Sequence, residues 1–446
     1  MNDLINIQNA VRVQAEDIVI LNSPRQYKDE LKKQIASAKH RIYITALYLQ
    51  DDDAGREILD ALYEAKQKTP SLDIKVFVDA HRARRGLIGE KQSEGNRGLY
   101  LKYEELRAES IEIYGVACKT KELFGVLHLK GMVFDDLLFY TGASVNDVYL
   151  HQADKYRLDR YYLIENTQLS DSFVNFINEM FVDSDFAPRL NVEEFPEPVE
   201  LKKRIVQLRK QLVTSQYKVT NKTTDLDPQN SLLIEPLVGF GRRKNELNQK
   251  VRRLIQQSQQ HITVFTPYFN LPKVLIRDVA KALKRGVKIE ITVGDKTAND
   301  FYIHDQEKFS TIGIVPYIYE ILLVRFAKRW KKYIENGQLV IRLWKHDCNS
   351  YHLKGIIVDQ RYHLVTGSNI NPRAWSLDLE NGILIDDTQK ALMPRVEREL
   401  ELIYEHTKIV ESYQQLETVK DYPLKPQKLL NKLRMTQIDR VLKRLL

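Results

Sequence analysis

The sequence predicts an α/β protein of two homologous domains, each a mainly parallel sheet flanked by helices, related by a pseudo-twofold axis. Three observations lead to this fold class. A strand–helix–strand pattern occurs in both halves, equivalent residues of the halves are separated by a nearly constant interval, and 446 residues suit two domains better than one. Because a helix between two strands normally joins parallel neighbours, the pattern favours parallel sheets.

The first half begins this pattern at residues 41–49, where β-branched and aromatic residues alternate as they do in a strand. Residues 54–68 then have a helical pattern, and residues 72–79 are predicted as the next strand. Together they form one strand–helix–strand unit.

The second half repeats the unit with a strand at residues 261–269, a helix at 274–285 and a strand at 287–293. Tyr48 corresponds to Tyr268, and further along His128 corresponds to His352, with a similar interval. The chain is therefore an internal duplication with small insertions.

The seam between the halves is expected at residues 191–227, which contain prolines, a charged helical segment and a polar run. We place the first domain at residues 1–210 and the second at residues 211–446, each with one copy of the motif described below. The second domain also carries basic amphipathic segments.

The net charge of +8 favours anionic partners such as nucleic acid, acidic lipid headgroups or phosphorylated metabolites. The two cysteines are too few for a disulfide framework and lack the spacing of metal ligands, which fits a reducing compartment. The first residues lack the features of a secretory signal, and no apolar run reaches the roughly 18 residues of a membrane span. We expect a cytoplasmic protein with, at most, peripheral membrane attachment.

The motif His-x-Lys-x4-Asp occurs twice, as His128-Leu-Lys130-Gly-Met-Val-Phe-Asp135 and His352-Leu-Lys354-Gly-Ile-Ile-Val-Asp359. Residues i and i+2 of a strand point to the same face, so each His and Lys should project together into a cleft. Asp135 and Asp359 are expected to be structural, tying each motif strand to its neighbour.

A Gly-rich turn with Ser and Asn follows each motif, and these polar side chains are candidates for hydrogen bonds to phosphate. The turns are Gly142-Ala-Ser144-Val-Asn146 and Gly367-Ser368-Asn369-Ile-Asn371. A single strand histidine is more often a satisfied core or surface residue than a catalyst. The same arrangement at equivalent places of both halves argues against that reading. If the halves pack about a twofold axis, two imidazoles and two ammonium groups surround one phosphate.

The paired motifs resemble the phospholipase D superfamily. The whole chain more closely resembles the phosphatidylserine synthases of Gram-negative bacteria, which transfer a phosphatidyl group from CDP-diacylglycerol to L-serine. The resemblance rests on the motifs, their turns and the neighbouring residues 46–51, 154–161 and 372–381. Superfamily members commonly have Gly-Ser-x-Asn after the motif, whereas both turns here carry the last Asn one position later.

The resemblance implies a metal-independent reaction in two steps through a covalent phosphohistidine, without a cofactor. It implies His128 as nucleophile and His352 as general acid and base, although the reverse assignment is open. Lys130 and Lys354 would bind the non-bridging phosphate oxygens. An acidic residue some thirty positions after each histidine would hold its ring, and the residues in those positions are Asp159 after His128 and Glu380 after His352. Tyr48, Tyr268 and Arg82 are further candidates for substrate binding.

Membrane contact is expected from two amphipathic segments. Within residues 316–334, Ile318, Leu322, Phe326, Trp330 and Ile334 recur at i+4 beside basic residues, as in a helix that lies in an anionic membrane surface. The alternative is a core helix with a solvated basic face. Residues 425–446 form a second basic amphipathic segment, which could equally pack against the body.

Other functions stay open at this point. They are another lipid exchanger of the superfamily (a cardiolipin synthase or a phospholipase D hydrolase), a phosphodiesterase acting on nucleic acid, and a non-enzymatic adaptor that binds membranes or ribosomes. Incidental association with ribosomes or nucleic acid would follow from the basic charge. The oligomeric state is open.

Overall fold

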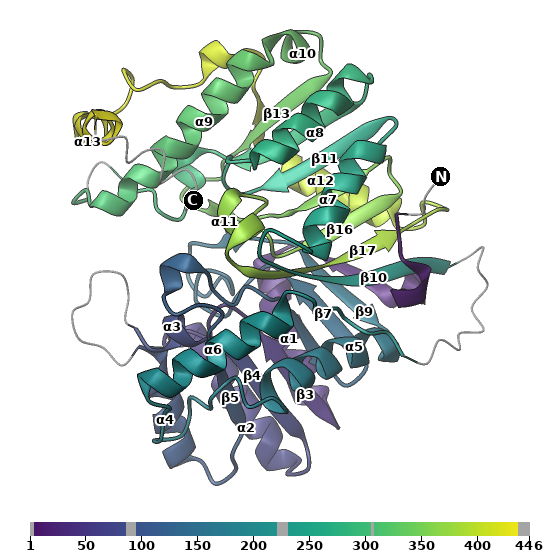
Figure 1. Ribbon diagram of the computed structural model, residues 1–446, viewed down its shortest axis with the longest axis vertical. Helices are drawn as coiled ribbons and strands as arrows, with labels where there is room; N and C mark the ends of the chain where they lie inside the picture. The colour runs from purple at the N-terminus through teal and green to yellow at the C-terminus, as the bar shows by residue number, and fades with distance from the viewer. Residues whose placement is uncertain (1–3, 86–94, 221–230, 305–306, 436–446) are drawn as a thin grey trace.

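The computed structural model describes residues 4–85, 95–220, 231–304 and 307–435. Figure 1 shows two lobes stacked along the longest axis, with the first half of the chain below and the second half above. Each lobe is built around one β-sheet with helices against it, so the predicted α/β class and the two-lobed organisation are confirmed.

The sheet of the first lobe has seven strands. In spatial order they are β2 (Ile18–Leu21), β9 (Tyr161–Glu165), β7 (Leu137–Thr141), β6 (Gly131–Phe134), β3 (Arg41–Thr45), β4 (Asp73–Asp79) and β5 (Glu112–Val116).

The sheet of the second lobe has nine strands. In spatial order they are β1 (Val11–Gln14), β10 (Ser231–Phe240), β17 (Leu379–Asp386), β16 (Tyr362–Thr366), β15 (Gly355–Val358), β11 (His261–Thr266), β12 (Lys288–Gly294), β13 (Leu339–Trp344) and β18 (Thr407–Ile409). A short parallel ladder between β8 (Arg157–Leu158) and β14 (Ser350–Tyr351) joins the lobes.

Six strands of each sheet follow the same order: β9-β7-β6-β3-β4-β5 in the first lobe matches β17-β16-β15-β11-β12-β13 in the second. Parallel pairing within these sheets is confined to β3, β4 and β5 and to their equivalents β11, β12 and β13. The sheets are therefore mixed rather than mainly parallel. The physical reason is that each motif strand, β6 and β15, turns back directly into an antiparallel hairpin with β7 and β16.

The helices of the first lobe are α1 (Pro24–Ser37), α2 (Asp53–Lys68), α3 (Ala80–Ala83), α4 (Asn96–Leu106), α5 (Thr167–Ile177) and α6 (Pro198–Leu212). In the second lobe they are α7 (Glu246–Gln257), α8 (Lys273–Lys284), α9 (Val315–Arg329), α10 (Lys331–Glu335), α11 (Pro372–Ser376), α12 (Met393–Tyr404) and α13 (Leu424–Met435). Helices α2 and α8 confirm the predicted segments 54–68 and 274–285 within one residue, whereas the predicted segment 316–334 is divided between α9 and α10.

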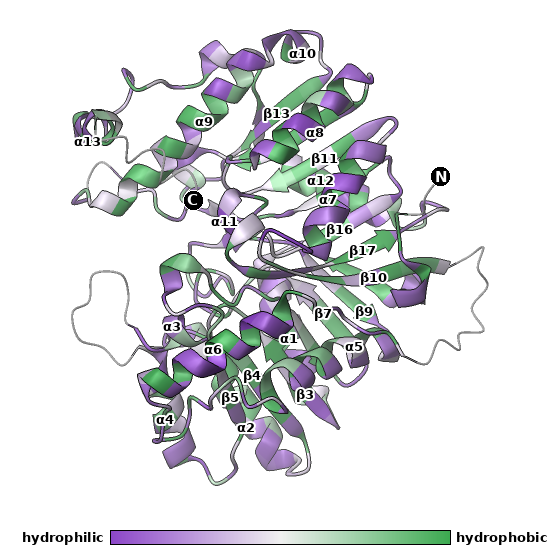
Figure 2. Ribbon diagram, in the orientation of Figure 1, coloured by the Kyte–Doolittle hydropathy of each residue, from purple (hydrophilic) through white to green (hydrophobic). Residues whose placement is uncertain are grey.

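Hydrophobic residues concentrate on the strands, while helices such as α1 and α6 alternate hydrophobic and hydrophilic residues (Figure 2). One buried apolar cluster crosses the junction of the lobes, since it contains Leu129 and Val133 together with Leu353 and Ile357. The two motif segments thus pack in a common core, and this shared packing fixes the position of one lobe relative to the other.

The apolar ridge of α9 is a core element, so the prediction that it lies in a membrane surface is wrong. Ile318, Phe326 and Ile334 are only 3%, 5% and 7% exposed, and Leu322 and Trp330 are partly buried against the same clusters. The basic residues beside this ridge are exposed, as in the alternative of a core helix with a solvated face. An i+4 apolar ridge has the same sequence pattern whether a sheet or a membrane covers it.

Helix α13 also packs against the body, through Leu430, which is 4% exposed in a cluster that contains Tyr268 and Tyr422. Leu433 of the same amphipathic segment is partly buried against this cluster, while its other candidate residues, Ile438, Leu442 and Leu445, lie outside the described residues. The expected domain boundary at 210/211 falls inside α6, and β1 lies in the sheet of the second lobe, so the division by residue number stays a prediction.

Candidate active site

Each motif begins in an extended segment that immediately precedes its strand. Leu127 and Leu129 turn into the common core, and the alternation of extended backbone directs His128 and Lys130 to the other side. The second lobe holds this segment, because His128 N–H donates to the carbonyl oxygen of Leu379 at 2.9 Å.

The second motif repeats this arrangement with the lobes exchanged. His352 N–H donates to the carbonyl oxygen of Leu158 at 2.9 Å, next to the β8–β14 ladder. Each motif segment therefore makes a backbone hydrogen bond to the opposite lobe. The bonded residue is the one immediately before Glu380 in one case and before Asp159 in the other.

Gly131 and Gly355 start the motif strands with φ values of 114° and 146°, in a region that favours glycine. A Cβ atom at Gly131 would lie 2.8 Å from the ring of Phe173, and one at Gly355 would lie 2.6 Å from Nη1 of Arg160. These glycines turn the backbone between the catalytic segment and the strand where a side chain has no room.

Each motif histidine contacts the acidic residue of the opposite lobe. His128 Nδ1 lies 2.8 Å from Glu380 Oε2, and His352 Nδ1 lies 3.1 Å from Asp159 Oδ2. The pairing that the resemblance implied, with each histidine held by the acid of its own half, is therefore wrong. The crossed backbone bonds cause the exchange, since they place each histidine beside the β-strand of the other lobe.

His352 has two further partners at Nδ1. The hydroxyl of Tyr149 lies 2.8 Å away, and Nζ of Lys354 also contacts this nitrogen. Lys354 Nζ in turn donates to Asp159 Oδ2 at 2.8 Å. Both imidazoles thus use Nδ1 for support, which leaves Nε2 as the ring nitrogen for chemistry.

The two motif lysines lie between the lobes and are almost fully buried. Lys130 Nζ donates to Ser144 Oγ at 3.0 Å, and a Cβ atom at Gly367 would lie 2.5 Å from Lys130 Cγ. On the other side, a Cβ atom at Gly142 would lie 3.0 Å from Lys354 Nζ. Each lysine therefore packs over the turn glycine of the opposite lobe, and the two clefts are one site.

The electrostatics follow from crowding these cations in a buried place. Burial and Lys130 hold the pKa of His128 well below its ordinary value, while burial and Lys354 lower the pKa of His352 to about 4. Burial and Lys354 lower the pKa of Lys130 to about 7. Both imidazoles are therefore neutral at physiological pH, the state that a nucleophile or a base needs.

The acids differ in their electrostatic surroundings. Although burial opposes ionisation of Asp159, Lys354 and His352 hold its pKa below the ordinary value. Burial and Asp378 raise the pKa of Glu380, and Lys130 opposes this effect.

The two polar turns correspond position by position from their glycines. Ala143 N–H and Ser368 N–H make the same bond to Thr141 and Thr366, both at 3.1 Å, so Ser144 is equivalent to Asn369 rather than to Ser368. The second hairpin is one residue longer, which the sequence pattern did not reveal.

The two asparagines of the turns cap the segments that follow them. Asn146 Oδ1 accepts from Tyr149 N–H at 3.0 Å, and Asn371 Oδ1 accepts from Ala374 N–H at 2.8 Å at the start of α11. Ser368 Oγ accepts a long bond of 3.4 Å from the backbone of Ile370. A role of these side chains in binding phosphate stays a prediction.

The motif aspartates bind backbone N–H groups of the neighbouring strand. Asp135 accepts from Lys39, His40 and Arg41 at 2.8–3.0 Å. The equivalent Asp359 accepts from residues 259–261, each at 2.8 Å. These contacts tie β6 to the start of β3, and β15 to the start of β11, outside the site.

The three other candidates for substrate binding, Tyr48, Tyr268 and Arg82, differ in whether they contact a motif histidine. Tyr268 stands beside His352, with ring centroids 6.0 Å apart, whereas the hydroxyl of Tyr48 accepts from Arg157 at 3.3 Å. Arg82 pairs with Glu122 at 3.3 Å and is 5.6 Å from the Tyr48 ring.

Sequence reasoning missed several residues that shape the site. Asn381 accepts from Lys130 N–H at 2.8 Å and donates to the Lys130 carbonyl oxygen at 2.7 Å, which fixes the lysine backbone. Tyr149, Arg157 and Asp300 surround His352. Asn381 follows Glu380 directly, and Arg157 stands two positions before Asp159. Nearness in the sequence to these two acids was therefore the one signal that could have identified them.

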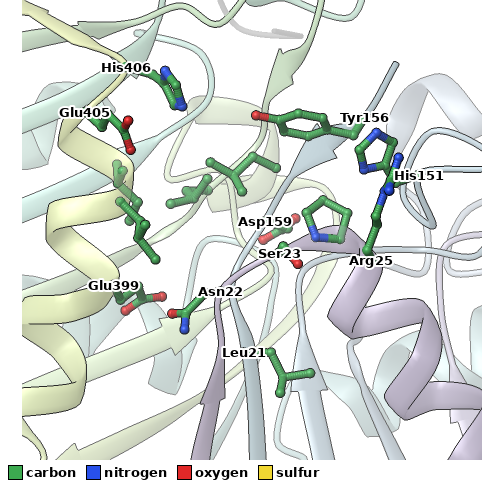
Figure 3. Close-up of a pocket in the computed structure, with 15 residues that line it drawn as sticks. Leu21, Asn22, Ser23, Arg25, His151, Tyr156, Asp159, Glu399, Glu405 and His406 are labelled. Atoms are coloured by element: carbon green, nitrogen blue, oxygen red, sulfur yellow. The ribbon is translucent and has the colours of Figure 1, made fainter. Parts of the chain in front are cut away.

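A cavity of about 230 Å³ lies behind Asp159. Figure 3 shows Arg25 and His151 on one side of it and Glu405 and His406 on the other. Among the described residues that line it, Asp159 is the one that belongs to the candidate catalytic residues. The cavity therefore contacts Asp159, the carboxylate that holds His352, and His352 itself is not one of its described lining residues.

The described residues contain no group of three or more His, Cys, Asp or Glu side chains that could hold a metal ion. Within the same described ranges, none of the helices has both the length and the apolar character that crossing a membrane requires.

Comparison with known proteins identifies the family to which this chain belongs. The sequence model described as "Cardiolipin synthase, PLD-like domain" matches residues 31–178 and again residues 251–404, one match in each lobe. The CDP-diacylglycerol–serine O-phosphatidyltransferase PssA of Escherichia coli (strain K12) is 47% identical, over 97% of this chain and 95% of its own length. The enzyme of that name from Haemophilus influenzae is 45% identical, over 97% of this chain and 96% of its own.

The crystal structure of phosphatidylserine synthase from Haemophilus influenzae superposes with a TM-score of 0.93 at 44% identity, covering 98% of this chain and 97% of that one. A CDP-diacylglycerol–glycerol-3-phosphate 3-phosphatidyltransferase of Saccharomyces cerevisiae is 26% identical over 95% of this chain and 87% of its own length. The chain therefore belongs to the phospholipase D-like family, in the group of the CDP-diacylglycerol–serine O-phosphatidyltransferases.

Proposed function

We propose that this chain transfers the phosphatidyl group of CDP-diacylglycerol to L-serine and releases CMP. The observation that carries the proposal is the pair of crossed histidine–carboxylate contacts around two buried lysines, at 2.8 and 3.1 Å. Relatives of the same activity match nearly the full length of the chain, which favours serine over other acceptors of the family.

In the first step, Nε2 of His128 attacks the phosphorus that carries diacylglycerol. The P–N bond forms as the pyrophosphate P–O bond breaks, and CMP leaves with the bridging oxygen. Glu380 supports the positive charge that develops on the His128 ring. CMP is stable as an anion, and negative charge from the donor beside His352 raises the pKa of that ring, so His352 can supply a proton to the leaving oxygen.

In the second step, Nε2 of His352 takes the proton of the serine hydroxyl. The serine oxygen attacks the phosphorus, the P–N bond to His128 breaks, and phosphatidylserine is formed. Asp159 supports the imidazolium that His352 becomes. The cycle thus begins with a neutral His128 and a protonated His352, and it ends with both rings in those same states.

Lys130 and Lys354 stabilise the charge on the non-bridging oxygens while phosphorus is five-coordinate. Their ammonium groups are held by Ser144 on one side and by Asp159 on the other, so they require little reorganisation. Preorganised charge in a buried site is worth more than the same charge in water, which supports these two residues as the main electrostatic contributors.

The lipid donor lies in a bilayer, so we also propose peripheral attachment to an anionic membrane, at the inner face of the cytoplasmic membrane. The net charge of +8 supports this attachment. Exposed apolar residues such as Leu123 and Phe124, which are 52% and 47% exposed, favour contact with a surface of mixed charge and hydrocarbon. Association with ribosomes or nucleic acid stays a prediction from charge alone.

The test is to incubate the purified chain with CDP-diacylglycerol in mixed micelles, with and without L-serine, and to identify the lipid product. We expect phosphatidylserine and CMP in equal amounts, dependent on serine. Phosphatidic acid at the same rate with or without serine would instead indicate a hydrolase. Phosphatidylglycerol or cardiolipin formed in preference to phosphatidylserine would indicate a different lipid exchanger.

A further inference from the structure

A group of polar side chains from both lobes surrounds the solvent-facing edge of His352. Arg157 and Asp300 form an ion pair with Nε and Oδ1 2.9 Å apart, and Tyr268 donates to Asp300 Oδ2 at 2.7 Å. The guanidinium of Arg157 lies 4.7 Å from the ring of Tyr149, the residue whose hydroxyl contacts His352. The charged pair and the proposed base are thus parts of one cluster.

The ion pair has buried hydrogen-bonding capacity that the protein itself does not fill. Although Arg157 Nε and Asp300 Oδ1 lie within ion-pair distance, neither atom has a hydrogen-bond partner, so the two charges are close but misaligned. The two side chains are 15% and 14% exposed, in contrast to 0% for Lys354 and 1% for Asp159. A small molecule that approaches His352 from solvent meets this pair before it meets the lysines.

The duplicated fold does not require this pair. Arg157 stands two positions before Asp159, and the residue two positions before Glu380 is Asp378, of opposite charge. Asp378 pairs with Arg373 at 3.1 Å within its own lobe, whereas Arg157 pairs across the lobes. The two halves of the site therefore differ in the residues around the histidines while they agree in the motifs.

The stereochemistry of the proposed reaction places the acceptor on this side. Displacement at phosphorus is in line, so CMP leaves from the face opposite His128, and the acceptor that attacks the His128 adduct enters at that same face. In the proposed reaction His352 serves that face, first as the acid for CMP and then as the base for the acceptor. A serine whose hydroxyl faces His352 Nε2 has its α-carbon, with the carboxylate and ammonium groups, a few ångströms beyond.

We propose that Arg157 and Asp300 form the acceptor subsite, in which the guanidinium binds the α-carboxylate of L-serine and the carboxylate binds its α-ammonium group. This inference rests on the proposed function, because it names the residues that select an amino acid at that site. A zwitterion offers an oppositely charged group to each member of the pair, whereas water and glycerol carry no charge and make only weaker hydrogen bonds. Tyr268, through its bond to Asp300, positions the carboxylate.

The experiment compares two reactions of the full-length enzyme in mixed micelles. One is phosphatidylserine synthesis at varied L-serine, and the other is the exchange of labelled CMP into CDP-diacylglycerol, which uses the first step alone. For Asp300→Asn we expect the ratio of kcat/KM for serine to the CMP exchange rate to fall about 10- to 100-fold, since a charge-assisted bond to the ammonium group is lost. Arg157→Gln should lower both reactions, because the departing CMP phosphate occupies the same face.

The matched control is Asp278→Asn. Asp278 pairs with Arg252 at 2.8 Å between α7 and α8, so this change removes an aspartate from an ion pair outside the site. The expected ratio for the control is that of the unaltered enzyme. Ethanolamine has the ammonium group without the carboxylate, so transfer to ethanolamine should fall in Asp300→Asn as transfer to serine does. Transfer to glycerol, which has no ammonium group, should be the same in this variant as in the unaltered enzyme.

Three outcomes overturn the inference. The first is an unchanged ratio for Asp300→Asn, with both reactions retained. The second is a ratio that stays unchanged because serine transfer and CMP exchange fall equally. The third is an equal loss for serine and glycerol. If the unaltered enzyme makes no phosphatidylserine, the proposed function fails and takes this inference with it. If it makes phosphatidylserine but the ratio does not move, the inference alone fails.

Discussion

The ring of His128 is held by Glu380, a carboxylate from the other half of the chain, with Nδ1 and Oε2 2.8 Å apart. The equivalent contact of His352 with Asp159 crosses the lobes in the opposite direction. Neither half thus contains a complete histidine–carboxylate pair. The duplication is functional only when the lobes close on each other, and the backbone bonds of both histidines to the opposite lobe provide that closure.

The crossed pairing predicts that Glu380→Gln impairs the chemistry of His128. Glutamine keeps the shape but cannot stabilise the imidazolium, so we expect kcat to fall by about 10²–10⁴-fold, in the range seen when the orienting acid of a catalytic histidine is replaced by an amide. Formation of the phosphoenzyme from labelled CDP-diacylglycerol is the measurement. Asp386→Asn, on the same strand but paired with Arg361, is the control and should leave this rate nearly unchanged. A normal adduct rate in Glu380→Gln would mean that its contact with His128 is structural.

Replacing the two histidines should separate the two steps. His352→Ala keeps the nucleophile, so it should release one equivalent of CMP, accumulate the covalent lipid adduct and stop. His128→Ala should form no adduct, and neither variant should turn over with serine. The adduct can be detected by mass spectrometry of the quenched protein. An adduct in His128→Ala alone would exchange the two roles, and sustained turnover in both variants would reject a shared site.

The fold and the motif residues could be predicted because they depend on local pattern. Alternation and helical periodicity located β3, α2 and β4 and their counterparts in the second lobe. The repeated His-x-Lys pairs indicated the candidate catalytic residues, since the same arrangement twice is hard to explain by core packing, and the structure brings these residues together in one site. The parallel or antiparallel sense of the sheet was mistaken, because a hairpin of motif strand and return strand has no distinct signal when both strands are buried.

Contacts between the lobes could not be predicted from the sequence. Counting thirty residues from His128 leads to Asp159, but closure of the lobes decides that Asp159 serves His352. Arg157 and Asp300 are far apart in the sequence and belong to no motif, so their meeting depends on the same closure. The membrane helix was mispredicted for the opposite reason: the pattern around Phe326 is real, but pattern alone does not identify what covers it.

Activity should decline at alkaline pH because Lys130 loses its charge. Burial and Lys354 lower the pKa of Lys130 to about 7, so the ammonium form is complete below that pH and is lost as pH rises through it. The profile of kcat/KM for CDP-diacylglycerol, which reports the free enzyme, should therefore fall above about pH 7. The bound anionic donor stabilises the ammonium, so the decline in kcat should lie at higher pH. An acidic decline in the kcat/KM profile comes from protonation of the nucleophile His128, and burial and Lys130 hold the pKa of that ring well below its ordinary value. A kcat/KM profile that is flat to pH 9 would contradict the proposed charge state of Lys130.

Chelation should leave the rate nearly unchanged. In the proposed reaction the positive charge around phosphorus comes from Lys130 and Lys354, and the nucleophile is an imidazole that needs no metal to activate it. Initial rates before and after dialysis against EDTA are the measurement, with ionic strength held constant because the basic surface is salt-sensitive. Strong inhibition that a divalent ion reverses would contradict this chemistry.

Asn381 should be required for both the stability and the activity of the enzyme. Its side chain is fully buried and satisfies the N–H and carbonyl groups of Lys130, and it donates to the hydroxyl of Tyr217 at 2.9 Å. Asn381→Ala leaves these buried groups without their partner, which should lower the free energy of unfolding by about 1–3 kcal/mol. It also frees the backbone that aims the lysine, so kcat should fall even where the variant is fully folded. Denaturant unfolding and CMP release measure the two effects. Asn336→Ala, which removes an exposed cap of Gln338 far from the site, is the control and should change neither by a comparable amount. A stable, fully active Asn381→Ala would mean that the core around Tyr140 and Tyr217, rather than this amide, fixes Lys130.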